Sequence, residues 1–186
     1  LPQHGMKLIL FLASKAKYQN EMIEDIEMAN YLTNIFNYVN KSEDQTKKAD
    51  LVLAVISFIR YSKKFQTFAE IYSNAGFLHT AIDSTISSNN DKCIDQGLLL
   101  FDQLFHEGIW FNDFSYFVEK ISKALTNMQQ KQAQRSIVVL LALAVMFPQS
   151  RPIMKDNEIA KIVSKININS NSVNYRNNLL QILNQS

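Results

Sequence analysis

The sequence contains few of the residues that make tight turns and cross-links. Only four glycines and three prolines interrupt its 186 residues, and Cys93 is the single cysteine. Proteins built from sheets need more turn residues, so long helices with short connections are expected. A lone cysteine cannot form an internal disulfide, and its presence favours a reducing, intracellular compartment, either cytoplasmic or nuclear.

Long runs of like charge and long apolar runs are also missing. The formal net charge is +2, and no five consecutive residues carry the same charge. This balance argues against wholesale nucleic-acid binding, which normally needs a strongly basic face. The longest apolar stretch, Ile137 to Phe147, is too short for a bilayer, so no membrane span is expected.

The side-chain clusters that enzymes need are not evident in the sequence. His4, His79 and His106 are far apart and lack the spacing of a helical metal site. Asp102 and His106 are four residues apart, and we expect a solvated pair on a helix surface rather than a catalytic one. Phosphate-binding glycine loops, paired cysteines and catalytic serine motifs are absent. We therefore expect a non-enzyme without cofactor or metal.

One pattern recurs along the chain: a polar turn followed by a helix with an apolar middle. The spacing between copies is about forty residues, within the range of helical repeats. It predicts an all-α fold with five long helices and no sheet. These helices should be centred near Leu10, Ile56, Leu100, Leu141 and Leu180.

The best-formed copy runs from about residue 65 to 108. Gly76 is expected to end a short first helix, and Phe77 to Ile86 form a second. The polar turn Ser87 to Asp91 then caps a third helix with one apolar stripe. That stripe consists of Ile94, Gly97, Leu98, Phe101, Leu104 and Phe105. Gly97 within it predicts a close helix crossing that leaves no room for a larger side chain.

This unit resembles an armadillo repeat. The resemblance rests on Asn74-Ala75-Gly76-Phe77-Leu78, the turn Ser87-Ser88-Asn89-Asn90-Asp91 and the leucine-rich Gly97-Leu98-Leu99-Leu100. It implies a right-handed superhelical solenoid. The next unit replaces the glycine turn with Phe111-Asn112-Asp113, which leaves the choice between armadillo and HEAT repeats open. Trp110 is the only tryptophan, so the groove does not resemble that of importin-alpha.

The repeat predicts a single helical-repeat domain over residues 1–186. A partial unit covers residues 1–20, and full units cover about 21–64, 65–108, 109–149 and 150–186. Pro148 and Pro152 should enclose a helix break. The last unit is shorter and more polar, as a capping repeat should be. Because the chain opens on an apolar helix without its turn, we expect a fragment of a longer protein.

The predicted partner-binding site lies on the third helices, which line the concave face in armadillo-like proteins. Offset from the core stripe are Asp95, Leu99, Asp102 and His106, followed in the next unit by Val138, Leu141 and Val145. Exposed aliphatic side chains in line would form an apolar patch that monomers rarely leave uncovered. The alternative is that the later helix is buried on all sides, by a segment of the chain or by a second copy, as a central core element.

A second candidate surface is basic. Lys47, Lys48, Arg60, Lys63 and Lys64 flank the helix Leu51 to Ile59 and could meet an anionic partner. The expected function is a non-catalytic scaffold or protein-interaction module that binds an extended segment or helix. Two alternatives remain: a nucleic-acid-binding repeat in which this patch joins Lys15 and Lys17, and a helical accessory domain of an enzyme.

Overall fold

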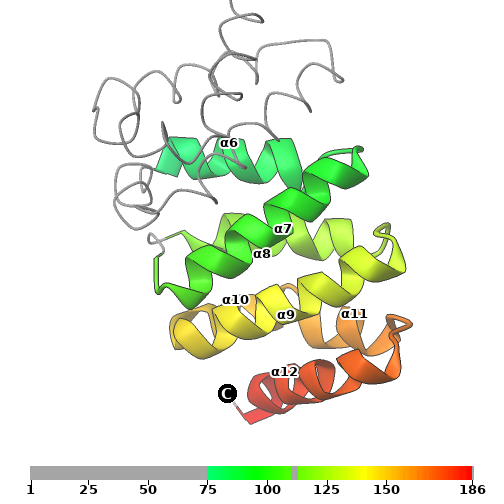
Figure 1. Cartoon of the computed structure of the whole chain (residues 1–186). Coiled ribbons are helices and arrows are strands. Elements are labelled where there is room, and N and C mark those ends of the chain that lie inside the picture. Colours follow the sequence, from blue (N-terminus) through cyan, green and yellow to red (C-terminus); the bar gives the residue numbers. More distant parts are fainter. Residues whose placement is uncertain (1–74, 110–112, 186) are drawn as a thin grey trace, which may run out of the picture. The chain divides into compact units, whose positions relative to one another are not determined.

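The computed structural model describes residues 75–109 and 113–185, and these ranges are helical, without a strand (Figure 1). The elements are α6 (Ala75–Thr85), α7 (Asp91–His106), α8 (Phe114–Leu125), α9 (Gln130–Met146), η1 (Pro148–Ser150), α10 (Arg151–Asp156), α11 (Ile159–Lys165), η2 (Ser170–Ser172) and α12 (Val173–Gln185). The all-α prediction is confirmed for these ranges. Three predicted centres, Leu100, Leu141 and Leu180, lie within α7, α9 and α12. Leu10 and Ile56 lie outside the described residues.

The chain divides into two compact units, Leu1–Gly97 and Leu98–Ser186, with the boundary inside α7. In the described part of the first unit, α6 is followed by a polar turn and the first half of α7. Asn90 caps α7, because its Oδ1 accepts hydrogen bonds from the backbone N–H groups of Lys92 at 3.0 Å and Cys93 at 3.3 Å. The turn predicted between Ser87 and Asp91 is therefore present.

Gly97 is buried where α7 meets the end of α6. A Cβ atom added to Gly97 would overlap the Cβ and Oγ1 atoms of Thr85. The Thr85 side chain is fixed, since its hydroxyl donates a hydrogen bond of 2.6 Å to the carbonyl oxygen of Ala81. The predicted close approach at Gly97 is confirmed, and the side chain it meets is that of Thr85.

Gly76 has a different position from the one predicted. It lies in the first turn of α6, which begins at Ala75. The prediction that Asn74-Ala75-Gly76 forms a helix stop is wrong for Ala75 and Gly76. The physical reason is that both small residues are accepted in a first helical turn, where apolar residues such as Leu78 then anchor the helix in the core.

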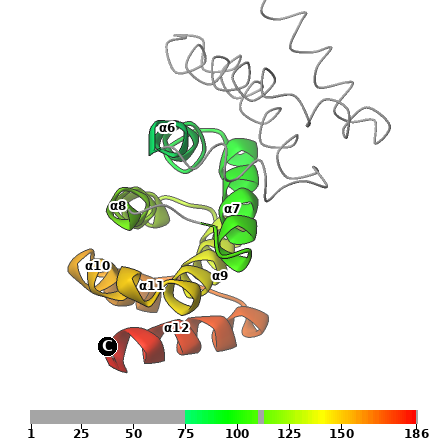
Figure 2. The same ribbon diagram turned by 90° about the vertical axis from the view of Figure 1, so that its left-hand side faces the viewer.

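The second unit has two layers of helices (Figure 2). The helices α8, α10 and α11 form one layer, and the second half of α7 and α9 form the other. Helix α12 crosses the end of the unit below α10 and α11 and also packs against α9. Phenylalanine side chains fill the space between the layers near α7. The ring of Phe117 on α8 lies 4.8 Å from that of Phe101 and 5.3 Å from that of Phe105, measured between centroids. These contacts fix the buried face of α7 against α8.

The two polar turns that open α8 and α9 provide caps. Asp113 accepts a hydrogen bond of 3.3 Å from the backbone N–H of Tyr116 at the start of α8. Gln129 and Gln132 form a reciprocal capping box at the start of α9. Of the predicted Phe111-Asn112-Asp113 turn, only Asp113 is described.

A sharp break follows α9, as the two prolines predict. The chain turns by 117° between α9 and the segment Pro148–Asp156. Two side chains donate to carbonyl oxygens near the end of α9, where that of Leu143 also accepts from the backbone N–H of Phe147 at 2.9 Å. Arg151 Nε donates to the carbonyl oxygen of Ala144 at 2.9 Å, and Ser150 Oγ donates to that of Leu143 at 3.4 Å.

Among the helices of residues 75–109 and 113–185, no single one combines the length and the apolarity needed to cross a bilayer. The segments Gln130–Met146 and Pro148–Asp156, which are bent relative to each other, are together long and apolar enough to cross one, by length and composition alone.

The last segment is built from short helices followed by α12. Glu158 stands between α10 and α11 in the left-handed backbone region, with φ of 52°. The buried side of α12 consists of Leu179 and Leu183, which face α9 and α11. Its exposed residues are Asn174, Tyr175, Asn177, Asn178, Gln181, Asn184 and Gln185. This exposed side carries no charge, in agreement with the polar character predicted for the last unit.

Candidate functional site

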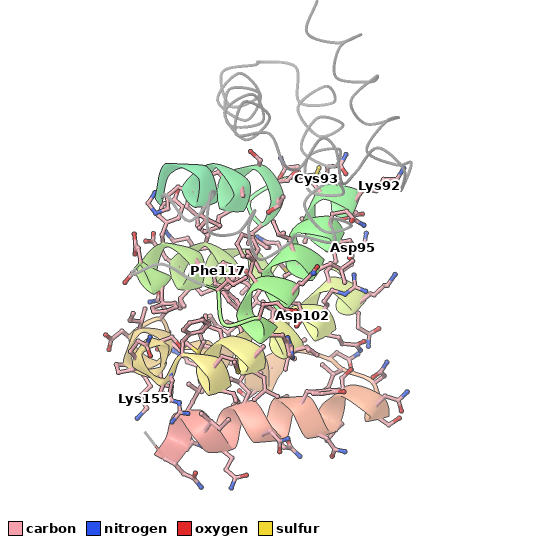
Figure 3. All side chains as sticks on the ribbon, turned by 60° about the vertical axis from the view of Figure 1, so that its left-hand side comes forward. Lys92, Cys93, Asp95, Asp102, Phe117 and Lys155 are labelled. Carbon is pink, nitrogen blue, oxygen red and sulfur yellow. The ribbon has the colours of Figure 1, made fainter. Side chains whose placement is uncertain are left out.

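The α7 part of the predicted site forms one stripe along the helix. Asp95, Leu99, Asp102 and His106 are spaced by four, three and four residues, which keeps them on one helical face. Figure 3 labels two of them, Asp95 and Asp102, along α7. Asp95, Leu99 and Asp102 are half-buried and His106 is exposed. The neighbouring core stripe is buried throughout. The sequence therefore separates a buried face from a partly open one along this helix, although Asp95 belongs to the first compact unit and the other three to the second.

Asp102 and His106 interact within α7. His106 Nδ1 lies 2.8 Å from the carbonyl oxygen of Asp102 and 3.3 Å from its Oδ1 atom. A carbonyl oxygen can only accept, so Nδ1 carries the proton in this hydrogen bond. The His106 side chain is 61 % exposed. This geometry is that of a local surface pair, and it leaves the imidazole Nε2 atom facing away from its own helix.

The α9 part of the predicted site is aliphatic. Val138 and Leu141 are half-buried, and Val145 is 50 % exposed. Their immediate neighbours Val139 and Leu140 are fully buried. Within one chain, α9 is therefore not buried on all sides at its second half. Burial of this end by a second copy stays the alternative.

Met146 extends this apolar end of α9 and was not singled out from the sequence. It is 45 % exposed and directly follows Val145. A signal for it was present, because the helix break at Pro148 leaves the last turn of α9 with fewer neighbours. Periodicity alone did not reveal this, since it places Met146 within the same apolar run.

The structure places the two stripes of the second unit on neighbouring helices. The second half of α7 and all of α9 lie side by side in one layer, in both views of the ribbon. Because the core stripes of both helices are buried against the rest of the unit, their half-exposed stripes lie on the outer side of this layer. Leu99, Asp102 and His106 thus share a layer with the three α9 aliphatic residues.

The basic candidate surface cannot be placed. Lys47, Lys48, Arg60, Lys63 and Lys64, together with Lys15 and Lys17, lie outside the described residues, so the anionic-partner site stays a prediction. Cys93 lies within them and is completely buried, which fits a small apolar core residue. Within residues 75–109 and 113–185, His, Cys, Asp and Glu side chains do not gather in groups of three or more that could hold a metal ion.

A surface groove that sequence reasoning missed lies at the far end of the second unit. It has a volume of about 540 Å³ and is bounded by the end of α8, the start of α9 and the length of α11. No sequence signal marks it, because its walls come from segments about thirty residues apart that meet only through tertiary packing.

Comparisons with known proteins were made at three levels. A scan against protein-family models found no match, and neither did searches of curated proteins and of solved structures. The resemblance to armadillo repeats therefore rests on the sequence motifs alone.

Proposed function

We propose that this chain is a non-catalytic protein-interaction or scaffold module with armadillo- or HEAT-like repeats arranged as a right-handed solenoid. In this proposal it acts inside the cell within a larger assembly. Its outer α7–α9 stripe binds an extended segment or a helix of a partner protein. This stripe consists of Leu99, Asp102 and His106 on α7 and Val138, Leu141 and Val145 on α9. Repeat surfaces of this kind bind through shape and spaced anchors, and they need no titratable cluster.

The observation that carries the proposal is the partial exposure of aliphatic side chains along α9. Val145 is half exposed, and Val138 and Leu141 keep part of their surface in water. Leaving such groups in solvent has a cost that a bound partner would remove, at about 25 cal/mol for each Å² of apolar surface covered. The stripe is thus a suitable location for hydrophobic anchors of an interface.

The α7 stripe supports the proposal through its polarity. Asp102 and His106 lie beside the aliphatic Leu99 and remain partly or largely exposed. Specific interfaces combine an apolar centre with a polar rim that orients the partner. The two stripes together provide both components on one layer of helices.

Site-specific photo-cross-linking tests this proposal directly. A photoreactive phenylalanine analogue replaces Val145 in one variant of the full chain and Leu99 in a second. A third variant carries it in place of Lys155, an exposed residue on α10 in the opposite layer. We expect the same cross-linked protein species from the first two positions in native extracts, and its absence from the third.

The cross-linked species must also depend on the stripe. Leu99→Asp, combined with the photoreactive group at position 145, should reduce the yield of that species while the thermal melt stays cooperative. Equal yields from Lys155 and Val145, or no species from either stripe position, would contradict the proposal.

A further inference from the structure

The groove at the end of the second unit has the size of a ligand-binding site. Its volume of about 540 Å³ falls within the range of about 300 to 1,000 Å³ typical of binding pockets. It is formed by residues from Leu125 to Ala133 on one side and from Glu158 to Asn167 on the other. None of the residues in the outer α7–α9 stripe lines it. Any binding here is independent of the proposed function above.

The lining of the groove is mainly aliphatic at its base. Leu125 and Ala133 are buried, whereas Met128, Ile162 and Ile166 are only half-buried. These three side chains therefore keep apolar surface in contact with solvent inside a concave site. Methionine and isoleucine of this kind accept a single aliphatic side chain well, because methionine adapts to the shape of its neighbour.

One edge of the groove is basic. Lys161 and Lys165 are both exposed and lie one turn apart on α11. Lys161 Nζ donates to Glu158 Oε1 at 2.8 Å. The pKa of the Glu158 carboxyl is held below its usual range, first by this hydrogen bond and then by the charges of Lys161 and Lys165. The positive charge of Lys165 thus affects the Glu158 carboxyl at this edge of the groove, although Lys165 is not part of the Glu158–Lys161 ion pair.

The surrounding part of the chain is basic as well. Residues 113–186 contain nine lysines and arginines and four aspartates and glutamates, which gives a net charge of +5. The whole chain carries only +2. The positive charge is therefore concentrated in the part of the molecule that forms the groove, where it attracts anionic segments.

Charge alone does not distinguish an acidic protein segment from a nucleic acid. Proteins that bind single-stranded nucleic acids stack the bases on aromatic side chains. None of the residues that line the groove is aromatic. Its half-buried aliphatic side chains instead match a leucine- or isoleucine-like anchor, which a peptide brings and a nucleic acid does not.

We propose that this groove binds a short acidic peptide segment of a partner protein. One large aliphatic side chain of the segment lies against Met128, Ile162 and Ile166. Acidic residues beside that anchor pair with Lys165 and, by exchange with Glu158, with Lys161. The site is a second interaction surface, distinct from the outer stripe on α7 and α9.

Selection from a library of short random peptides displayed on phage, carried out on the full chain, tests the chemistry of the occupant. We expect enrichment of peptides with a Leu, Ile, Met or Phe flanked by Asp or Glu. An enriched peptide is then synthesised with a fluorescent label, and its binding is measured by anisotropy. Replacing its aliphatic anchor by Ala should weaken binding by at least about tenfold.

Matched charge reversals locate the binding site. Lys165→Glu should weaken the labelled peptide by about three- to tenfold, because an attraction at the groove edge becomes a repulsion. Lys155→Glu makes the same change in charge at an exposed residue outside the groove and should alter binding by less than about twofold. Leu99→Asp, on the outer stripe, should leave peptide binding unchanged.

Several results would overturn the proposal. They are a selection without enrichment of acidic peptides, equal losses from Lys165→Glu and Lys155→Glu, and complete displacement of the peptide by a labelled single-stranded RNA that binds more tightly. Loss of peptide binding in Leu99→Asp would instead assign the peptide to the outer stripe. That outcome would overturn the groove site and leave the proposed function standing.

Discussion

At the residue scale, Gly97 shows how one missing side chain sets the distance between two helices. Helix propensity alone would make Gly97→Ala stabilising. The overlap expected between the added Cβ and Thr85 makes the substitution destabilising instead. Gly97→Ala should lower the free energy of unfolding by about 1–3 kcal/mol through overpacking. Urea denaturation followed by circular dichroism measures this loss.

A second substitution tests whether Thr85 is the cause. Thr85→Gly removes the Cβ and hydroxyl that the new methyl group would meet. In that background Gly97→Ala should cost much less, so a double-mutant cycle should give a favourable coupling free energy. Additive losses would mean that another neighbour opposes the methyl group.

Glu158 presents the opposite case, a side chain where the backbone favours glycine. Its φ of 52° lies in the left-handed region, which disfavours residues with a Cβ atom. Glu158→Gly should therefore unfold at a higher temperature than Glu158→Ala. The corresponding difference in the free energy of unfolding should be up to about 1 kcal/mol. Both variants lose the exposed ion pair with Lys161, so the comparison isolates the backbone. Equal melting temperatures of the two variants in differential scanning calorimetry would contradict a backbone preference for glycine at position 158.

At the element scale, the end of α9 depends on a side chain that comes after the break. Arg151 closes the carbonyl oxygen of Ala144 from the first position of α10. Arg151→Met keeps most of the aliphatic stem and removes the donor, so it should cost about 1–2 kcal/mol of unfolding free energy. Lys155→Met on the same helix is exposed and should change stability by less than about 0.5 kcal/mol. Chemical denaturation of the two variants gives the comparison.

The elements were predictable where local chemistry determines them. Asn90 caps α7 because a short polar side chain reaches backbone N–H groups two or three residues ahead, and the sequence predicted a capping turn there. Asp113 caps α8 in the same way, although the sequence analysis identified only the turn that contains it. Gly76 was misplaced because a glycine suits either a helix end or a first helical turn, so its presence alone does not distinguish the two positions. Caps and apolar stripes are local features that the sequence predicts. The start of α6 at Ala75 is a helix boundary that local sequence did not predict.

The candidate sites divide in the same way. The partial exposure of Leu99 and Asp102 on α7 agrees with helical periodicity, which separates them from the buried stripe. Their role in binding a partner stays a prediction. The groove lined by Met128 and Ile162 was not predictable, because it exists only where α11 packs near the turn between α8 and α9. The extra exposure of Met146 arises from the break in the chain rather than from its position in the apolar run.

At the scale of the whole molecule, the two-layer arrangement of the second unit gives α7 and α9 different inner and outer sides. The inner side of α7 meets α8 through Phe101, Phe105 and Phe117. The outer sides of α7 and α9 keep a partly open stripe. A solenoid continues such a layer from unit to unit, so that the stripes join into one extended surface. The solenoid itself remains our proposal, and the stripe is the part of it that single substitutions can test.

Adjacent leucines provide matched pairs for that test. Leu98 and Leu140 are fully buried, whereas their neighbours Leu99 and Leu141 are half-buried on the outer side. Leu98→Asp and Leu140→Asp place a carboxylate in the core and should cost more than about 4 kcal/mol, enough to unfold the chain. Leu99→Asp and Leu141→Asp leave the carboxylate access to water and should cost only about 1–2 kcal/mol.

Thermal melts of the four variants and recovery of the cross-linked partner then separate folding from binding. We expect Leu99→Asp and Leu141→Asp to melt cooperatively and to lose the partner, since a carboxylate replaces an aliphatic anchor in the interface, where one anchor contributes about 2 kcal/mol or more. If they melt as poorly as the buried pair, the stripe belongs to the core. If they melt well and retain the partner in full, the interface lies on another surface of the molecule.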